Sequence, residues 1–107
     1  MFKVINDGND YFRKGQYDRA VEEYNKAIDN GTKAFQLSEK LNYENGSAAA
    51  FKTLGNVYSD QGDYATALNY YYRSLKIKEK IKDKKGIAAL FNNIGNIHRA
   101  MEEYKAA

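Results

Sequence analysis

The middle of the chain carries two apolar stripes with helical spacing. The first stripe consists of Phe51, Leu54, Val57 and Tyr58, and the second of Tyr64, Ala67, Leu68, Tyr71 and Leu75. Residues spaced three or four positions apart share one face of an α-helix. The Gln61-Gly62-Asp63 stretch between the stripes is typical of a turn. The pattern therefore predicts two helices joined by a short turn.

A glycine inside the first of these helices indicates close packing. Gly55 lies in mid-helix, where glycine costs about 1 kcal/mol relative to alanine. Its retention there suggests that the second helix approaches the backbone closely. A single pair of helices cannot bury both of its apolar faces, so the pattern should recur along the chain.

The pattern does recur, in three copies. Gly-Asn pairs stand at 8–9, 55–56 and 95–96, and Tyr11, Tyr58 and His98 follow three residues after each glycine. Further on, Tyr17, Tyr64 and Tyr104 each precede an alanine by three residues, at Ala20, Ala67 and Ala107. The turn glycine is Gly15 in the first copy and Gly62 in the second, but Glu102 in the third.

These positions resemble the tetratricopeptide repeat, in its variety with forty-residue spacing. The resemblance implies an all-α fold, a right-handed superhelical array of antiparallel helix pairs, that is, an α-solenoid of about two and a half units. One departure is that no proline closes a second helix. We expect Asn45-Gly46 and Lys85-Gly86 to supply the breaks, because glycine tolerates the left-handed conformation that ends helices.

We expect a single domain over residues 1–107. Repeat 1 should span about 1–30, an inserted or extended helical segment 31–46, repeat 2 about 47–85 and a partial repeat 3 about 86–107. Gly8 and Gly55 are seven residues further apart than Gly55 and Gly95. Seven residues add two helical turns and keep the same face. Either the chain breaks near Gly31 into two short helices, or one helix runs from Tyr17 to about Tyr43.

The polar stretch Asp29-Asn30-Gly31-Thr32 favours the break, as a helix stop followed by a new N-cap. The expected helices are then 1–14, about 17–29, 47–60, 64–83 and a last one from 86 or 87, which could run unbroken to the end because Glu102 replaces the turn glycine. Phe91, Ile94 and Met101 on the last helix should lack cover within the chain. That helix either caps the array or is covered by another copy through helix exchange.

Composition narrows the function. The chain has 107 residues, 43% of them apolar, which fits one soluble domain. It has no cysteine, which excludes disulfides, thiolate catalysis and cysteine zinc sites. It shows no run of eighteen apolar residues and no secretory signal pattern, so we expect no membrane association and a cytoplasmic location. The lysine-rich stretch 76–85 lacks interleaved aromatic residues, so we do not expect nucleic-acid binding.

No residue pattern indicates chemistry, and we expect no enzyme activity, no catalytic residue, no metal and no cofactor. His98 is the only histidine and stands at a repeat position held elsewhere by tyrosine, on the packed side, which indicates a structural histidine or one at the rim. A general base would need positioned partners. The glycines occur singly at repeat spacing and not as a nucleotide-binding loop.

The resemblance implies a concave groove, lined by the first helix of each repeat, that receives an extended peptide or a partner helix. The candidate groove residues are Asn9, Phe12, Arg13, Lys52, Asn56, Ser59, Asn92, Asn93, Asn96 and Arg99. Asn9, Asn56 and Asn96 share one repeat position and would form a ladder of amides, each with a donor and an acceptor for a peptide backbone. The resemblance also places Lys52, Asn56 and Asn93 at three of the five positions with which chaperone-binding members hold a C-terminal carboxylate.

The predicted function is therefore that of a protein–protein interaction scaffold that binds a peptide or partner segment in this groove. The alternative is a self-assembling or helix-exchanged repeat module, a homo-oligomer without a dedicated ligand.

Overall fold

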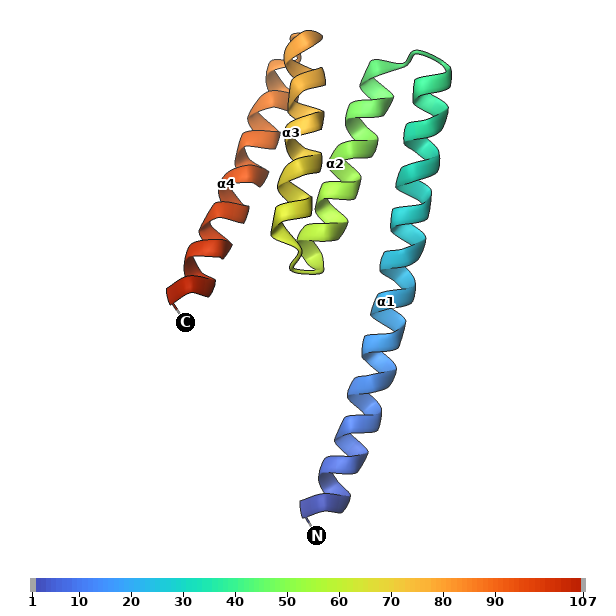
Figure 1. Ribbon diagram of the computed structural model, residues 1–107, viewed down its shortest axis with the longest axis vertical. Coiled ribbons are helices and arrows are strands. Elements are labelled where there is room, and N and C mark those ends of the chain that lie inside the picture. The colour runs from blue at the N-terminus through green and yellow to red at the C-terminus, as the bar shows by residue number, and fades with distance from the viewer. Residues whose placement is uncertain (1, 107) are drawn as a thin grey trace.

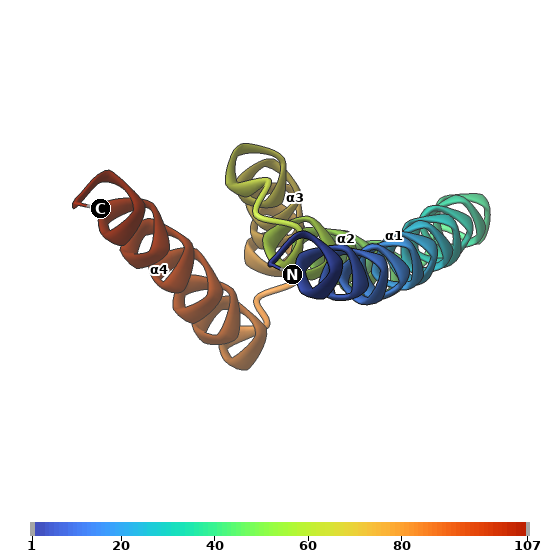
Figure 2. The ribbon, with the colours of Figure 1, turned by 90° about the horizontal axis from the view of Figure 1, so that it is seen from below.

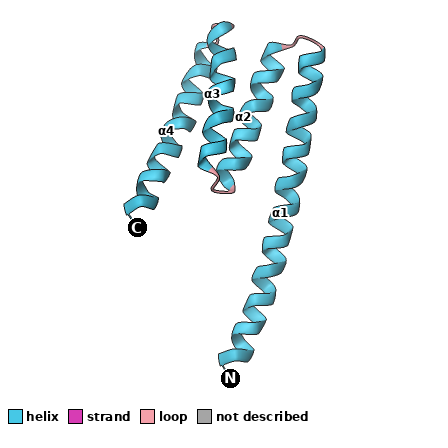
Figure 3. Cartoon of the chain, in the orientation of Figure 1, coloured by secondary structure: helices cyan, strands magenta, loops and turns pink. Residues whose placement is uncertain are grey.

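The computed structural model describes residues 2–106, with side-chain surroundings described for residues 13–105. Within these limits the chain forms four helices, α1 (Phe2–Lys40), α2 (Glu44–Asp60), α3 (Tyr64–Lys80) and α4 (Lys84–Ala106), joined by short turns (Figures 1 and 3). Each helix packs chiefly on its neighbours in the chain and runs antiparallel to them. The prediction of an all-α array of antiparallel helix pairs is confirmed.

The helices stand in a single row in chain order. Seen from below, α1 and α4 lie at opposite ends of the row with α2 and α3 between them (Figure 2). The molecule is long and flat, measuring 61 × 34 × 18 Å along its principal axes. Among the helices that the structure describes, none is long and apolar enough to cross a membrane.

The three turns share one backbone geometry, with a left-handed residue at the second position. These residues are Asn42 (φ 54°), Gly62 (φ 81°) and Lys82 (φ 59°). At the last position of two turns an aspartate caps the next helix. Asp63 accepts a hydrogen bond from the Thr66 amide at 3.3 Å, and Asp83 accepts one from the Gly86 amide at 3.0 Å.

The predicted breaks at Gly46 and Gly86 are wrong, because both glycines lie in the first turn of a helix. They stand there because a neighbour needs the space. A Cβ at Gly86 would lie 2.8 Å from Asp83 Oδ2 and 2.9 Å from the Lys78 side chain, and one at Gly46 would collide with Ser38. These glycines therefore admit close contacts at the start of α2 and α4.

The predicted break at Gly31 is also wrong, since α1 continues through it to Lys40. The polar residues around Gly31 bond within the helix. The Thr32 hydroxyl donates to the Ile28 carbonyl at 2.8 Å, and Lys33 pairs with Asp29 at 3.0 Å. A Cβ at Gly31 would lie 2.9 Å from Leu54 Cδ2, so this glycine allows α2 to approach α1.

No turn occurs at Gly15 either, so the expected helices 1–14 and 17–29 are parts of one helix. The helices α2, α3 and α4 begin twenty residues apart. At the same spacing, turns would fall at 21–23 and 101–103, where the chain reads Val-Glu-Glu and Met-Glu-Glu. Glutamate favours the helix and resists the left-handed conformation. Both α1 and α4 run straight through these positions, as expected for the helix that contains Glu102.

The core joins the faces of α2, α3 and α4. Its buried apolar residues on α2 are Ala48, Ala50, Phe51, Leu54 and Val57; on α3, Ala67, Tyr71 and Leu75; on α4, Leu90, Ile94 and Ile97. The predicted close packing at Gly55 is confirmed, because a Cβ there would lie 2.6 Å from the Tyr71 ring. Ile94 is buried and Met101 half-buried against this cluster, so the prediction that they lack cover is wrong. Phe91 remains 56% exposed.

A row of aromatic rings ties the first three helices together. The ring centroids of Phe35 and Phe51 lie 4.5 Å apart, and Tyr70 lies 6.0 Å from Phe51 and stacks on Tyr58 at 5.6 Å. The Arg73 guanidinium lies over Phe51 and Tyr70, at 5.8 and 5.5 Å from the ring centres. Pairs of aromatic rings contribute about 0.5–1.5 kcal/mol each to the free energy of unfolding, beyond the effect of their buried area.

Candidate functional site

A hollow between α2 and α4 gathers polar side chains from three helices. It has a volume of about 340 Å³ and is lined by Asn56, Ser59 and Asp60 of α2, Tyr71 of α3, and Asn93 and Asn96 of α4. We call it the asparagine hollow. It forms because α2 and α4 flank α3, and it brings together Asn56 and Asn96, which share one repeat position.

Tyr71 organises the floor of the hollow. The side chain is only 3% exposed, its ring packs over Gly55, and its hydroxyl donates to Asn56 Oδ1 at 2.5 Å. Burial raises the pKa of Tyr71, and the Asp60 carboxylate raises it further, whereas a hydrogen bond with Ser59 acts in the opposite direction. The phenol therefore stays protonated at neutral pH and keeps donating.

The Tyr71 bond fixes what Asn56 can offer to a ligand. Because Tyr71 occupies one acceptor position of Asn56 Oδ1, the Nδ2 donor and a second position on Oδ1 are left for another molecule. Asn93 and Asn96 each add an amide with a donor and an acceptor, and Asp60 adds an exposed acceptor. The chemistry of this lining is hydrogen bonding to groups that carry both donors and acceptors.

The structure brings four of the ten predicted groove residues into the asparagine hollow, namely Asn56, Ser59, Asn93 and Asn96. Four of the others have described side chains and do not line it. Lys52 is half-buried on α2, Asn92 and Arg99 are exposed on α4, and Arg13 is exposed on the projecting part of α1. Asn9 and Phe12 lie outside the residues whose side chains are described.

Tyr71 was assigned from the sequence only to the packing stripe. A signal for its second role was present, because a tyrosine that packs over a helical glycine extends its hydroxyl past the contact. The residue after that glycine, Asn56, is then within reach. The pairing of Gly55-Asn56 with Tyr71 could therefore have identified the floor of the hollow.

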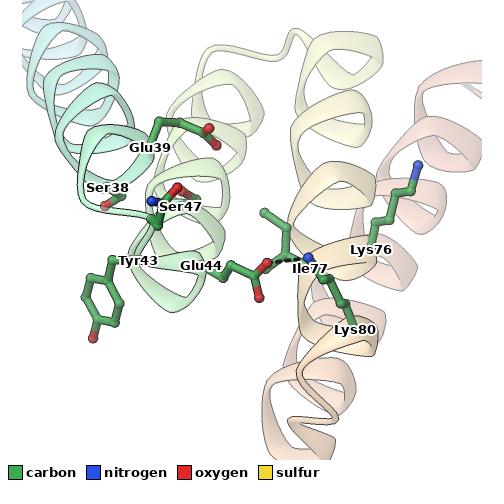
Figure 4. A pocket seen from close by; sticks show the side chains of 9 residues that line it. Ser38, Glu39, Tyr43, Glu44, Ser47, Lys76, Ile77 and Lys80 are labelled. Carbon is green, nitrogen blue, oxygen red and sulfur yellow. Dashed lines mark hydrogen bonds and ion pairs between the residues drawn. The ribbon is translucent and has the colours of Figure 1, made fainter.

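A larger hollow of about 490 Å³ lies at the other end of the helices (Figure 4). Its lining is Ser38, Glu39, Asn42, Tyr43, Glu44, Ser47, Lys76, Ile77 and Lys80. Glu44 and Lys80 form an ion pair across it, and Tyr43 points away from that pair. The hydrogen bond with Glu44 raises the pKa of Lys80. Glu44 and Lys80 therefore satisfy each other's charge in this hollow.

Titratable side chains do not gather into a metal site in the part of the chain that the structure describes, since no three of His, Asp and Glu come together there. His98 is exposed on α4. The prediction that it lies on the packed side is wrong, because none of the helices that the structure describes covers that side of α4.

Comparisons with known proteins agree with this architecture. The family profile described as tetratricopeptide repeat matches residues 6–80 and, in a second overlapping match, residues 46–107. Among solved structures, the chain is similar to the designed protein DA05, determined by solution NMR, with a TM-score of 0.71 and 20% sequence identity. That match covers 75% of this chain and 80% of DA05, and it is a likeness of fold. No curated protein matches the chain.

Proposed function

This chain belongs to the tetratricopeptide repeat family, and from that premise we propose that it binds an extended segment of a partner protein at the asparagine hollow. Repeats of this family generally mediate protein–protein interaction. For this chain, the proposed place of recognition is the asparagine hollow, and its chemistry is hydrogen bonding by amide side chains.

The observation that carries the proposal is the convergence of three amide side chains on one hollow. Asn56 comes from α2, and Asn93 and Asn96 come from α4. An extended polypeptide presents N–H and C=O groups alternately on its two sides. Amide side chains offer a donor and an acceptor in matching positions, so they recognise a backbone without demanding one sequence.

The hollow is also prepared for such a ligand before it binds. Tyr71 holds Asn56 by a hydrogen bond from a buried position, so the donor of Asn56 loses little freedom when it meets a carbonyl group. Preorganised groups bind more tightly because less entropy is lost on association.

Substitution of the α4 amides tests the proposal. Short linear peptides selected from a phage-displayed library against the wild-type chain provide the probe. Asn93→Ala and Asn96→Ala should each weaken the binding of a selected peptide about fivefold to tenfold, because each removes a hydrogen bond worth roughly 1 kcal/mol. Isothermal titration or fluorescence anisotropy measures the affinity.

Asn69→Ala is the matched control, since Asn69 is an exposed asparagine on α3 outside the hollow. It should leave the affinity unchanged. If selected peptides bind Asn93→Ala and Asn96→Ala as tightly as the wild type, the hollow is not the binding site. Circular dichroism of each variant checks that the helices remain intact.

A further inference from the structure

The uncovered side of α4 repeats a face that is covered on α2. On α4, Ala88, Phe91, Gly95 and His98 are exposed. Forty residues earlier, the same positions are Ala48, Phe51, Gly55 and Tyr58, which are buried or half-buried. A Cβ at Gly95 would meet nothing within 4 Å, whereas one at Gly55 would lie 2.6 Å from Tyr71. We call Ala88, Phe91, Gly95 and His98 the α4 face.

The helix that covers the α2 counterpart of this face is α3. The Ser74 hydroxyl donates to the Ala48 carbonyl at 2.7 Å, and the Tyr70 ring lies 6.0 Å from the Phe51 ring. The contact between α2 and α3 therefore shows how such a face is covered. The covering surface is the side of α3 that carries Tyr70, Ser74 and the positions in line with them.

The matching side of α1 is exposed. Forty residues before Tyr70, Ser74, Ile77 and Ile81 stand Asn30, Ala34, Leu37 and Leu41, which we call the α1 face. On α3 and its following turn the four residues are buried or half-buried. On α1 and its following turn all four are exposed, Leu37 by 58% and Leu41 by 65%.

The forty-residue register between α1 and α3 rests on contacts. Gly31 and Phe35 of α1 pack on Leu54 and Phe51 of α2. Their counterparts on α3, Tyr71 and Leu75, belong to the core cluster that α3 forms with α4. The C-terminal part of α1 therefore relates to α2 as α3 relates to α4, and the side that α3 turns toward α2 has no neighbour on α1.

We propose that copies of this chain associate head to tail, with the α4 face of one copy packed antiparallel on the α1 face of the next, as α2 packs on α3. Among the described residues, one end of the row has no helix that covers the α4 face, and the other end has no helix for the α1 face to cover. A second copy supplies both, and the alternation of helices continues across the junction.

The ends of the two helices permit this pairing. At Gly62 the chain reverses between α2 and α3, but α1 and α4 run straight past that level at Glu22 and Glu102. Both extensions point the same way in the molecule (Figure 1). In an antiparallel pair of α4 and α1, the two extensions therefore lie side by side at the same end and lengthen the contact. The two faces differ, so the contact is heterologous. Because each added copy continues the row of helices in the same direction, the array stays open.

The mass of the full chain as a function of concentration tests the proposal. Light scattering should give an average mass that rises with concentration beyond twice the 12.2 kDa of one chain, without a plateau. A constant single-chain mass at millimolar concentration would overturn the proposal. A plateau at twice the chain mass would overturn it too, because it indicates a closed dimer.

Two variants that each block one face give a sharper test. Phe91→Glu places a carboxylate in the α4 face, and Ala34→Glu places one in the α1 face. Each variant alone should associate at least about tenfold more weakly than the wild type, because the carboxylate would lose its water without gaining a partner. Leu37→Glu serves as a second variant of the α1 face.

Mixing the variants distinguishes the two kinds of interface. The Phe91→Glu chain keeps a working α1 face and the Ala34→Glu chain keeps a working α4 face, so an equimolar mixture should form a one-to-one pair and grow no further. A mixture that stays at single-chain mass contradicts the proposal. So does an Ala34→Glu variant that dimerises alone, because its contact would then join two α4 faces.

Asn25→Glu is the matched control for Ala34→Glu. Both substitutions add one carboxylate at an exposed position of α1, but nine residues of helix place them on opposite sides. Asn25→Glu should associate like the wild type. Neither proposed face contributes a residue to the asparagine hollow, so loss of association and loss of peptide binding are separable results.

Discussion

Gly55 and Gly95 occupy the same repeat position and meet different surroundings. Gly55 lies under the Tyr71 ring, where even a methyl group would be too close. Gly95 faces open space, because no helix follows α4 in the described chain. The same residue type therefore has opposite effects on the stability of a single chain at the two positions.

Replacing each glycine with alanine should give free-energy changes of opposite sign. Gly55→Ala should lower the free energy of unfolding by about 1–3 kcal/mol through overpacking. Gly95→Ala should raise it by about 0.5–1 kcal/mol, because alanine is the better helix former. Urea unfolding at micromolar protein concentration, where chains do not associate, measures both. Equal signs would contradict the different packing of the two glycines.

The glycines at packed positions also show how much of a single residue's role could be predicted from the sequence. The packing role of Gly55 was predictable, because a glycine between apolar residues in mid-helix needs a reason. Gly31 has the same role and was assigned to a break, because Asp29, Asn30 and Thr32 resemble a stop and a cap. The packing role of Gly31 becomes visible only in its contact with Leu54, a residue far away in the chain.

At the scale of elements, the turn between α3 and α4 is held by a charged hydrogen bond. Asp83 accepts hydrogen bonds from Lys78 at 2.8 Å and from the Gly86 amide at 3.0 Å. The bond with Lys78 lowers the pKa of Asp83, and the backbone amide lowers it further. The ionised carboxylate thus closes one helix and starts the next.

The Asp83→Asn substitution should have a pH-dependent effect. The pKa of Asp83 is lower in the folded state than the ordinary value of 3.8, so its contribution to stability is present above that pH. The contribution is lost as the pH falls through the folded-state pKa. Thermal unfolding of wild type and variant should differ most near pH 7, and the difference should disappear only at pH values below the lowered pKa of Asp83. A difference that stays constant with pH would show that the charge does not matter.

The register between helices was harder to predict than the helices themselves. Lys26-Ala27-Ile28 recurs seven residues later as Lys33-Ala34-Phe35, and seven residues make about two helical turns. Both stretches therefore place similar side chains on the same face, and α2 could pack beside either. The contact of Phe35 with Phe51 selects the second stretch, which the pattern alone does not distinguish.

On the scale of the whole molecule, α1 extends beyond the helices it packs against (Figure 1). The Tyr24 hydroxyl lies 3.4 Å from the Asp60 carbonyl oxygen, at the level where α2 ends. Residues 13–20 are all exposed, including Tyr17 at 69%. This part of α1 contributes little to the core.

Deleting residues 1–20 should therefore leave the remaining fold intact. The midpoint of thermal unfolding should change by less than about 2 °C, because residues 13–20, the part of the segment with described side chains, are all exposed. The helical signal in circular dichroism should fall only by the share of the residues removed. A fall in the midpoint of about 10 °C or more would indicate that the segment packs on the rest of the chain.

The candidate site was partly predictable on this scale. The repeat positions of Asn56, Asn93 and Asn96 followed from the pattern, and the structure places all three around one hollow. The part of the groove expected from the first copy depended on a turn at Gly15 that would bring another helix beside α2. Because α1 runs straight instead, Arg13 lies on its projecting part and not at the hollow.

The packing of each helix chiefly on its chain neighbours also bears on how the protein folds and opens. Contacts between residues near in sequence close only short loops, so the chain should fold rapidly, from the central hairpin of α2 and α3 outward. Backbone amide hydrogens should then exchange with solvent most slowly in α2 and α3, and progressively faster toward both termini. The outer helices α1 and α4 should therefore open before α2 and α3.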